Sequence, residues 1–217
     1  MVFQKVKLKN NYVLEILKNI EENLIPAINS LTYFDEDKKT NAKKYTSEEY
    51  CHKIISKGRD HQGLPEAAYH LSVLSSKHFS KLEGWDNTLE PLIFSESIKL
   101  QEYLSSNNQA LFAYYPPEGY IGWHNNADAP GYNVLFTWSE TGDGWFAYKD
   151  DDGKTIKVQD ERGWSCKMMH FASYYDKKNR NPMYHTAYTN CKRITMAFRF
   201  EESQNIWNDL MEDLQSE

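Results

Sequence analysis

Eight short β-rich runs, divided by turn residues, occupy the chain from about residue 109 to residue 200. They cover residues 110–115, 120–124, 133–138, 145–148, 155–158, 164–170, 183–188 and 193–200. Segments rich in Gly, Pro and Asp, such as Pro116–Gly119 and Asp150–Gly153, separate the runs and favour turns. Eight short strands that follow a helical segment predict a two-sheet jelly roll with helices packed on one of its sheets.

The first hundred residues show helical spacing instead. Asn10 and Asn11 can cap a helix that ends near Pro26 and whose apolar positions recur at steps of three and four: Val13, Leu14, Leu17, Ile20 and Leu24. Thr46-Ser-Glu-Glu49 has the spacing of a capping box and predicts a second helix.

Two further helices are expected. Leu64-Pro65-Glu66 is read as the start of a third helix that stops at Gly84 and has one apolar side: Ala68, Leu71, Leu74 and Phe79. A last helix is marked by a second apolar set: Ile206, Trp207, Leu210, Met211 and Leu214.

These patterns together predict an α+β fold, a double-stranded β-helix (jelly roll) core with N-terminal helices packed on one sheet. We expect residues 1–108 to form a helical elaboration, residues 109–200 the jelly-roll core, and residues 201–217 an acidic C-terminal helix. At 217 residues, all three parts fit one structural domain.

Charge and composition limit the class of partner. The net charge of −6 resides in residues 201–217, which contain acidic residues and no Lys or Arg, and no stretch is dominated by basic residues. The sequence therefore shows no basic segment that would bind the phosphates of a nucleic acid. Such binding would require a basic groove that forms only in the folded protein. No apolar run is long enough to cross a bilayer, and the N-terminus lacks the apolar core of a signal peptide. The three cysteines are scattered, which does not indicate a disulfide framework. We therefore expect a cytoplasmic protein.

Two histidines and an arginine lie on these predicted strands. His124 ends the second strand, His185 lies on the seventh, and Arg193 begins the eighth. The second and seventh strands of a jelly roll can be neighbours, so histidines 61 residues apart can face one cavity. Two neutral imidazoles and a carboxylate suit iron(II) and leave positions open for a chelating co-substrate and O₂. An arginine can hold the far carboxylate of that co-substrate through a two-pronged bond.

The third ligand is the point at which this pattern departs from a two-His-one-carboxylate site. Asn126 stands two residues after His124, where a carboxylate would be expected. Three interpretations are open. Asn126 binds iron through its amide oxygen or lies beside a water in the third position, Asp128 supplies the carboxylate from a turn, or no metal binds.

The segment from Tyr115 to Phe200 resembles the iron(II)- and 2-oxoglutarate-dependent dioxygenases. Their pattern is His-x-Asp/Glu, a distant His, and an Arg about eight to ten residues later; His124, His185 and Arg193 match it. The spacing of Tyr115, Arg193 and Arg199 also matches the branch that demethylates alkylated bases, but the polar residues between the two arginines of that branch are missing here.

The resemblance implies iron(II) as cofactor and 2-oxoglutarate as co-substrate, with no catalytic residue beyond the metal site. It implies that Arg193 and Tyr115 bind the co-substrate. Three roles are open for Arg199: binding the co-substrate, contacting the substrate, or pairing with an acid at the end of the sheet. Hydroxylation of a C–H bond in a small molecule, an amino acid or a peptide side chain is the expected reaction.

Two alternative functions are kept. The same chemistry could oxidise a modified nucleobase, which would require base extrusion and a basic approach surface. A non-catalytic jelly-roll binding module gains weight if the missing carboxylate means that iron is not held. Trp123 and Trp138 are expected mainly in the core, with lining of a substrate pocket as their second role, and His170 is the rival of His185 as distal ligand.

Overall fold

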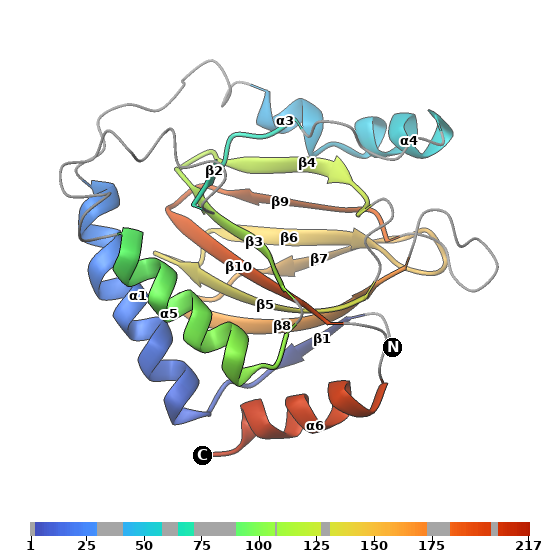
Figure 1. Cartoon of the computed structure of the whole chain (residues 1–217). Helices are drawn as coiled ribbons and strands as arrows, with labels where there is room; N and C mark the ends of the chain where they lie inside the picture. Colours follow the sequence, from blue (N-terminus) through green and yellow to red (C-terminus); the bar gives the residue numbers. More distant parts are fainter. Residues whose placement is uncertain are drawn as a thin grey trace.

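The computed structural model of the chain describes residues 3–29, 41–57, 65–71, 90–106, 108–126, 131–172, 183–200 and 204–217. Within these ranges, a segment of helices and two short strands precedes eight consecutive strands, and a last helix follows them (Figure 1). All structural statements below concern these residues.

Two antiparallel sheets form the centre of the molecule. The six-stranded sheet has the order β1-β8-β5-β10-β3-β2 and the four-stranded sheet the order β4-β9-β6-β7. The strands of the larger sheet are β1 (Phe3–Val6), β2 (Tyr69–His70), β3 (Asn108–Tyr115), β5 (Gly131–Ser139), β8 (Gly163–Phe171) and β10 (Arg193–Phe200). Those of the smaller sheet are β4 (Tyr120–His124), β6 (Gly144–Lys149), β7 (Thr155–Gln159) and β9 (His185–Thr189).

The predicted jelly roll is confirmed. Each of the eight predicted runs is a strand, from β3 to β10, and the runs 120–124 and 193–200 have the bounds of β4 and β10. As expected, the second and seventh core strands are neighbours (β4 and β9), and the eighth pairs with the first (β10 and β3). The double-stranded β-helix thus follows from turn chemistry and short apolar runs.

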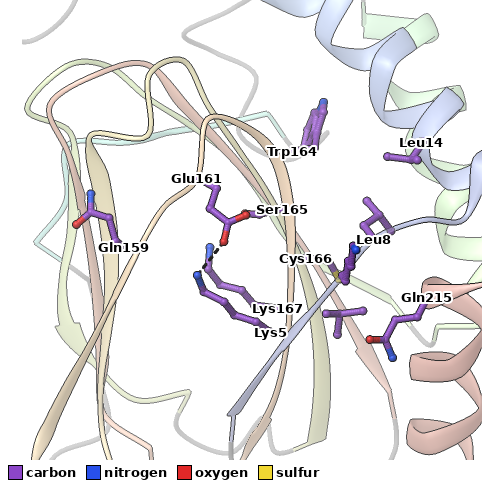
Figure 2. A pocket seen from close by; sticks show the side chains of 12 residues that line it. Lys5, Leu8, Leu14, Gln159, Glu161, Trp164, Ser165, Cys166, Lys167 and Gln215 are labelled. Carbon is purple, nitrogen blue, oxygen red and sulfur yellow. Dashed lines mark hydrogen bonds and ion pairs between the residues drawn. The ribbon is translucent and has the colours of Figure 1, made fainter.

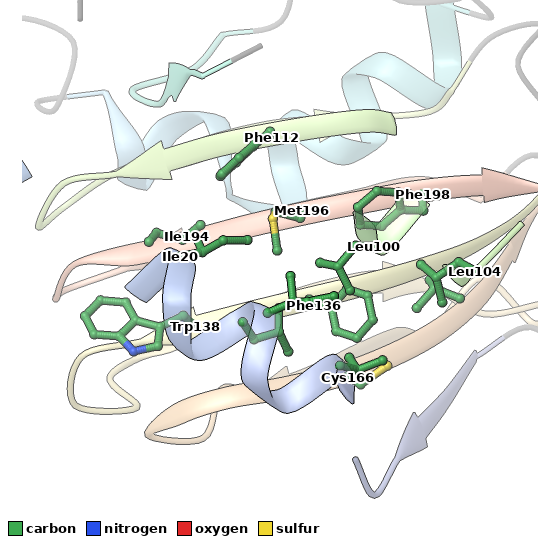
Figure 3. Packing of buried hydrophobic residues seen from close by; sticks show 14 of the residues in the cluster. Ile20, Leu100, Leu104, Phe112, Phe136, Trp138, Cys166, Ile194, Met196 and Phe198 are labelled. Carbon is green, nitrogen blue, oxygen red and sulfur yellow. The ribbon is translucent and has the colours of Figure 1, made fainter. Parts of the chain in front are cut away.

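Three helices cover the outer face of the larger sheet: α1 (Asn11–Asn29), α5 (Glu90–Tyr103) and α6 (Gln204–Gln215). Because side chains alternate along a strand, Ile194, Met196 and Phe198 of β10 point toward these helices and pack with Ile20 and Leu100 (Figure 3). The expected packing of helices on one sheet is therefore confirmed for this face.

Two short helices lie against the other sheet. They are α3 (Ala42–Tyr45) and α4 (Glu48–Lys57), and both contact β4. The second predicted helix is α4, but Ser47 caps it rather than Thr46, since the Ser47 Oγ accepts a hydrogen bond of 3.1 Å from the Tyr50 N–H.

The first predicted helix is α1, but its predicted end is wrong, and so is the third predicted helix over residues 65–71. Residues 65–71 are extended rather than helical. Strand β2 pairs with β3, with Tyr69 opposite Tyr114, and this pairing satisfies backbone groups that a helix would have bonded internally. Leu74 and Phe79 lie outside the described residues. Helix α1 does not stop near Pro26, because its buried face continues to Ile28 and the packing outweighs the backbone bond lost at proline.

Helices α3 and α5 and strand β1 were not predicted. Helix α5 buries Glu96 and Ser97 while Leu92, Phe94 and Ile98 are exposed, so its sequence lacks the one-sided apolar pattern of an ordinary surface helix. Strand β1 is a short edge strand whose lysine-containing sequence shows no apolar run. Among the described residues, no helix has both the length and the apolar character needed to cross a membrane.

The packing of α1 gives a direct test of the helix–sheet core. Leu17 is fully buried, whereas Leu14 on the same helix is 36% exposed. We expect Leu17→Ala to lower the free energy of unfolding by about 2–5 kcal/mol, because it removes buried contacts and leaves a cavity. The matched variant Leu14→Ala should cost less than about 1 kcal/mol. Urea unfolding followed by circular dichroism measures both, and equal losses would contradict the described orientation of α1.

Candidate metal centre

His124 and His185 are direct neighbours across the ladder between β4 and β9. The register pairs the two residues, and their ring centroids are 4.0 Å apart with an angle of 53° between the ring planes. Both side chains are buried. His124 is the last residue of β4 and His185 the first of β9, so the pair lies at one end of the space between the sheets.

Backbone carbonyls fix the protonation of both rings. The Nδ1 of His124 lies 2.8 Å from the Gly122 carbonyl oxygen, and the Nδ1 of His185 lies 3.1 Å from the Met183 carbonyl oxygen. A carbonyl oxygen can only accept, so Nδ1 is the nitrogen that carries the proton and donates. In the neutral ring the lone pair is then on Nε2. Metal-binding histidines have this arrangement, with one nitrogen donating to a carbonyl and the other binding the ion.

Apolar rings surround His185. The ring of Phe171 lies 4.7 Å from it and the ring of Phe146 lies 5.8 Å from it, measured between centroids. Both phenylalanines belong to the apolar cluster between the two sheets. They keep bulk water from this side of the imidazole and lower the local dielectric, which strengthens any charge interaction there.

Among the described residues, the observed pair of candidate donors consists of the two imidazoles, and Asn126, two residues after His124 in the chain, is a further candidate. Asn126 is half-buried just beyond the end of β4, and Asp128 lies outside the described residues. Within the described ranges, no group of three or more His, Cys, Asp and Glu side chains is arranged to hold a metal ion. Two Nε2 lone pairs fit a divalent iron, and the third protein ligand stays a prediction shared by Asn126 and Asp128.

A second polar cluster surrounds Arg193 at the start of β10. The Arg193 side chain is buried, its Nε donates to Asp160 Oδ2 at 2.8 Å, and its Nη1 donates to Thr195 Oγ1 at 2.6 Å. The guanidinium lies over the Tyr115 ring, 4.8 Å from its centroid. Tyr115 is the register partner of Arg193 on β3. The two residues predicted to bind one co-substrate thus lie together, although Arg193 also has a protein carboxylate as partner.

Sequence reasoning missed the other half of this cluster. Lys167 of β8 is buried, and its Nζ donates to Asp160 Oδ1 at 3.0 Å. Burial alone would raise the pKa of Asp160, but the charges of Arg193 and Lys167 outweigh it and hold that pKa below its ordinary value. Strand alternation could have predicted that Lys167 faces the space between the sheets. Lys167 is two residues before Met169, so the two side chains are on the same face of β8, and Met169 faces the other sheet.

Arg199 is on the same face of β10 as Arg193 but at the other end of the strand. Their Cα atoms are six residue steps apart along the strand, a distance of roughly 20 Å. Arg199 is half-buried, and a Cβ at Gly131 would lie 3.4 Å from its Cγ. Gly131 pairs with Phe171, whose ring contacts His185. Along β10, Arg199 is therefore nearer to the histidine pair than Arg193 is.

The predicted pocket tryptophans face elsewhere. Trp123 packs with Cys51 and Ile54 of α4, and its Nε1 donates to the Thr46 carbonyl oxygen at 3.0 Å. Trp138 packs in the core beneath the helices (Figure 3). Both rings point away from the inter-sheet cluster because neighbouring positions on a strand face opposite sides, so neither position supports the substrate-pocket role.

His170, the rival distal ligand, is also separate from the pair. Its ring packs 4.6 Å from the ring of Tyr132, which in turn lies 4.7 Å from Trp207 of α6. This places His170 on the helix-covered face of the larger sheet, whereas His185 faces His124. The preference for His185 over His170 is consistent with these positions.

Comparisons with known proteins give structural likeness without sequence likeness. No protein-family model and no curated protein sequence matches the chain. A prolyl-4-hydroxylase from Pseudomonas putida is similar over 87% of this chain and 100% of its own, with a TM-score of 0.35 and 10% identity. JOX2, solved in complex with 2OG, Fe and JA, is similar over 94% of this chain and 68% of its own, with a TM-score of 0.45 and 15% identity. YcfD, a ribosomal oxygenase from Escherichia coli, is similar over 54% of this chain and 29% of its own, with a TM-score of 0.31 and 13% identity.

The buried ion cluster predicts a pH-dependent loss of stability. Asp160→Asn leaves Arg193 and Lys167 without their shared carboxylate, so we expect a loss of roughly 3–5 kcal/mol in the free energy of unfolding near pH 7. The Asp160 pKa is lower in the folded protein than its ordinary value of 3.8. Its contribution is therefore complete above that value and is lost as the pH falls through the folded pKa.

Glu161, the next residue, supplies the matched control. Its carboxylate forms an exposed ion pair with Lys5, so Glu161→Gln should cost less than about 1 kcal/mol at any pH. Urea unfolding of the wild type and both variants between pH 3 and pH 8 measures the difference. A loss for Asp160→Asn no larger than that for Glu161→Gln would show that the cluster does not stabilise the fold.

Proposed function

We propose that the chain is an iron(II)- and 2-oxoglutarate-dependent dioxygenase that hydroxylates a C–H bond of a small molecule, an amino acid or a peptide side chain. The observation that carries this proposal is the His124–His185 pair. Both rings are buried, are held as Nδ1–H tautomers by backbone carbonyls, and lie on neighbouring strands of a jelly roll.

Each residue has a defined task in the proposal. His124 and His185 bind the metal through Nε2, and Asn126 or Asp128 completes the protein ligands. The chemistry that bound iron(II) would supply is the coupled conversion of the C–H bond, O₂ and 2-oxoglutarate into C–OH, succinate and CO₂. Arg193 binds the far carboxylate of 2-oxoglutarate, and the Tyr115 ring beneath it keeps the guanidinium in place.

The surroundings of the site serve the same chemistry. Phe146 and Phe171 exclude water beside His185. Burial raises the pKa of Tyr115 to about 12, so its hydroxyl stays protonated and can donate to a carboxylate. Arg199 stands at the histidine end of β10, where substrate contact is the role that its position favours.

One observation favours oxidation of a modified nucleobase as the second candidate. A groove of about 540 Å³ on α3 and α4 is lined by Lys43, Lys44, Ser47, Glu49, Tyr50 and Lys53, and both helices contact β4, the strand that ends at His124. Lysines beside a tyrosine suit a single strand with stacked bases. Binding of labelled oligonucleotides that weakens steeply with salt and with Lys43→Ala would support this candidate.

The metal site itself gives the first functional prediction. His124→Ala or His185→Ala should weaken Mn(II) binding by at least about 10- to 100-fold. Removing a group that hydrogen-bonds to a metal ligand already lowers metal affinity by about this factor, and removing the ligand itself should lower the affinity at least as much. Mn(II) electron paramagnetic resonance measures the affinity, and succinate release with iron(II) measures turnover. His170→Ala is the control and should change neither. A wild-type protein that binds no metal would leave the non-catalytic binding module as the function.

The third ligand gives the second prediction. We expect Asn126→Asp to raise Mn(II) affinity roughly tenfold or more, because an anionic carboxylate replaces a neutral amide beside a dication. Asp128→Asn is the companion variant, since it removes the other candidate carboxylate. If Asp128→Asn abolishes metal binding while Asn126→Asp leaves it unchanged, Asp128 is the ligand and the assignment of Asn126 is wrong.

A further inference from the structure

The larger sheet is incomplete beside the first residues of β8. Strand β1 pairs with β8 as far as Val6, which lies opposite Cys166. Gly163, Trp164 and Ser165 precede Cys166 in β8, and among the described strands they pair with β5, on their other side. Their backbone groups on the β1 side therefore have no strand partner in the described part of the chain. An unpaired edge of this kind can accept another extended segment.

A groove occupies the place where β1 would continue. It has a volume of about 440 Å³ and is lined by Trp164–Cys166 of β8 and by Lys7 and Leu8, where the chain leaves β1. Leu14 of α1 and Gln215 of α6 complete its helix side (Figure 2). The three β8 residues that β1 leaves unpaired span roughly 10 Å. The groove can therefore hold a short extended segment that continues the line of β1.

The two faces of this sheet edge differ in character, because side chains alternate along β1 and β8. Val6 and Cys166 belong to the core beneath the helices, and Trp164 is on the same face as Cys166. Lys5 is on the opposite face and forms an exposed ion pair with Glu161, which Figure 2 shows as a dashed line. A segment added to β8 would thus place one side chain on an apolar surface and the side chains before and after it on a charged surface.

Two lysines give the groove a preference for anions. Lys5 and Lys7 are both exposed, and Lys7 forms no ion pair with any described residue. The exposed pair between Lys5 and Glu161 contributes little to stability, so Lys5 can exchange its partner. Lysines at a sheet edge also disfavour pairing with apolar or basic strands. The charge therefore selects an added segment that carries acidic side chains.

We propose that the groove binds an extended acidic peptide by strand addition to β8, with an apolar residue between two acidic ones. The apolar side chain packs against Trp164, Leu8 and Leu14. The acidic side chains interact with Lys5 and Lys7, and the peptide backbone completes the ladder along Gly163–Ser165.

This docking surface is distinct from the candidate metal centre. Phe171, whose ring lies 4.7 Å from that of His185, is at the other end of β8. Eight residue steps, or roughly 25 Å, separate it from Gly163. The proposal therefore does not depend on the proposed function, and its test requires no metal.

Titration of acetyl-Glu-Val-Glu-Val-Glu-amide into ¹⁵N-labelled protein, followed by NMR, measures weak binding and also locates it. We expect shifts of the Trp164 indole signal, assigned with Trp164→Phe, and of the amide signals of residues 163–165. The affinity should fall as salt is added, because the charges are exposed. The same peptide with Lys in place of Glu should shift none of these signals.

Methylation of peptide nitrogens separates strand addition from charge attraction alone. Only alternate N–H groups of an added strand point toward its neighbour. One peptide is therefore methylated at both valine nitrogens and another at all three glutamate nitrogens. We expect one pattern to abolish binding and the other to preserve it.

Three variants test the walls of the groove. Lys7→Glu should weaken peptide binding about fivefold or more, since repulsion replaces attraction. Leu14→Ala should weaken it to a lesser degree while leaving the fold nearly as stable as the wild type. Lys18→Glu is the control, because it changes the net charge equally at an exposed position of α1 outside the groove, and it should leave binding unchanged.

Four results would overturn the proposal. They are no shift at millimolar peptide, equal shifts with the basic peptide, equal effects of the two methylation patterns, and equal affinities of Lys7→Glu and Lys18→Glu. Sedimentation of the free protein supplies a further check. A dimer that Lys7→Glu dissociates would make a second copy of the chain the occupant of the groove and would also overturn the peptide proposal.

Discussion

Strand β10 imposes the constraint on which the rest of the structure depends. It lies between β3 and β5 in the larger sheet. The side chains of its eight residues face the two sides of the sheet in strict alternation. Ile194, Met196 and Phe198 enter the helix-covered core, while Arg193 and Thr195 face the smaller sheet. A slip of one residue would bury two arginines beneath α1 and α5 and would expose the apolar side chains to the polar interior.

This division gives the two sides of the larger sheet different physical characters. The helix side is a continuous apolar core, and its stability comes from buried area. The inner side combines aromatic rings with histidines, two buried cations and a carboxylate. Replacing such an ion cluster with apolar residues of similar volume would often be neutral or stabilising, so folding alone does not explain why Asp160, Lys167 and Arg193 occupy it.

Sequence patterns predicted the jelly roll well because each of its strands is short, apolar and bounded by turn residues. Register then follows from alternation, which is why His124, His185, Tyr115 and Arg193 were placed on the correct strands. Helix α5 was missed because its buried face includes Glu96 and Ser97, so its placement depends on tertiary contacts that the local pattern does not contain.

The site was predicted less completely than the fold, for two physical reasons. Trp123 and Trp138 are on core strands, but the face on which each ring lies depends on register, and a count of strands does not supply it. Asp160 follows β7, while Lys167 of β8 and Arg193 of β10 lie on strands separated by β5. Nothing in a linear pattern links an acid and a lysine seven residues apart to an arginine on another strand. Core packing, the main role expected for both tryptophans, is observed, whereas the Asp160–Lys167–Arg193 cluster depends on tertiary contacts.

In the proposed function, charge couples metal binding to co-substrate binding. A site with two neutral imidazoles and an amide from Asn126 would leave the charge of a divalent metal uncompensated by protein, whereas a carboxylate from Asp128 would remove part of it. In the proposed function, a co-substrate that places a carboxylate on the metal offsets part of this charge, so its binding and metal binding reinforce each other by a free energy that is the same in either order. If the proposed function holds, the neutral side chain at position 126 weakens the metal site taken alone and makes metal retention depend on the co-substrate.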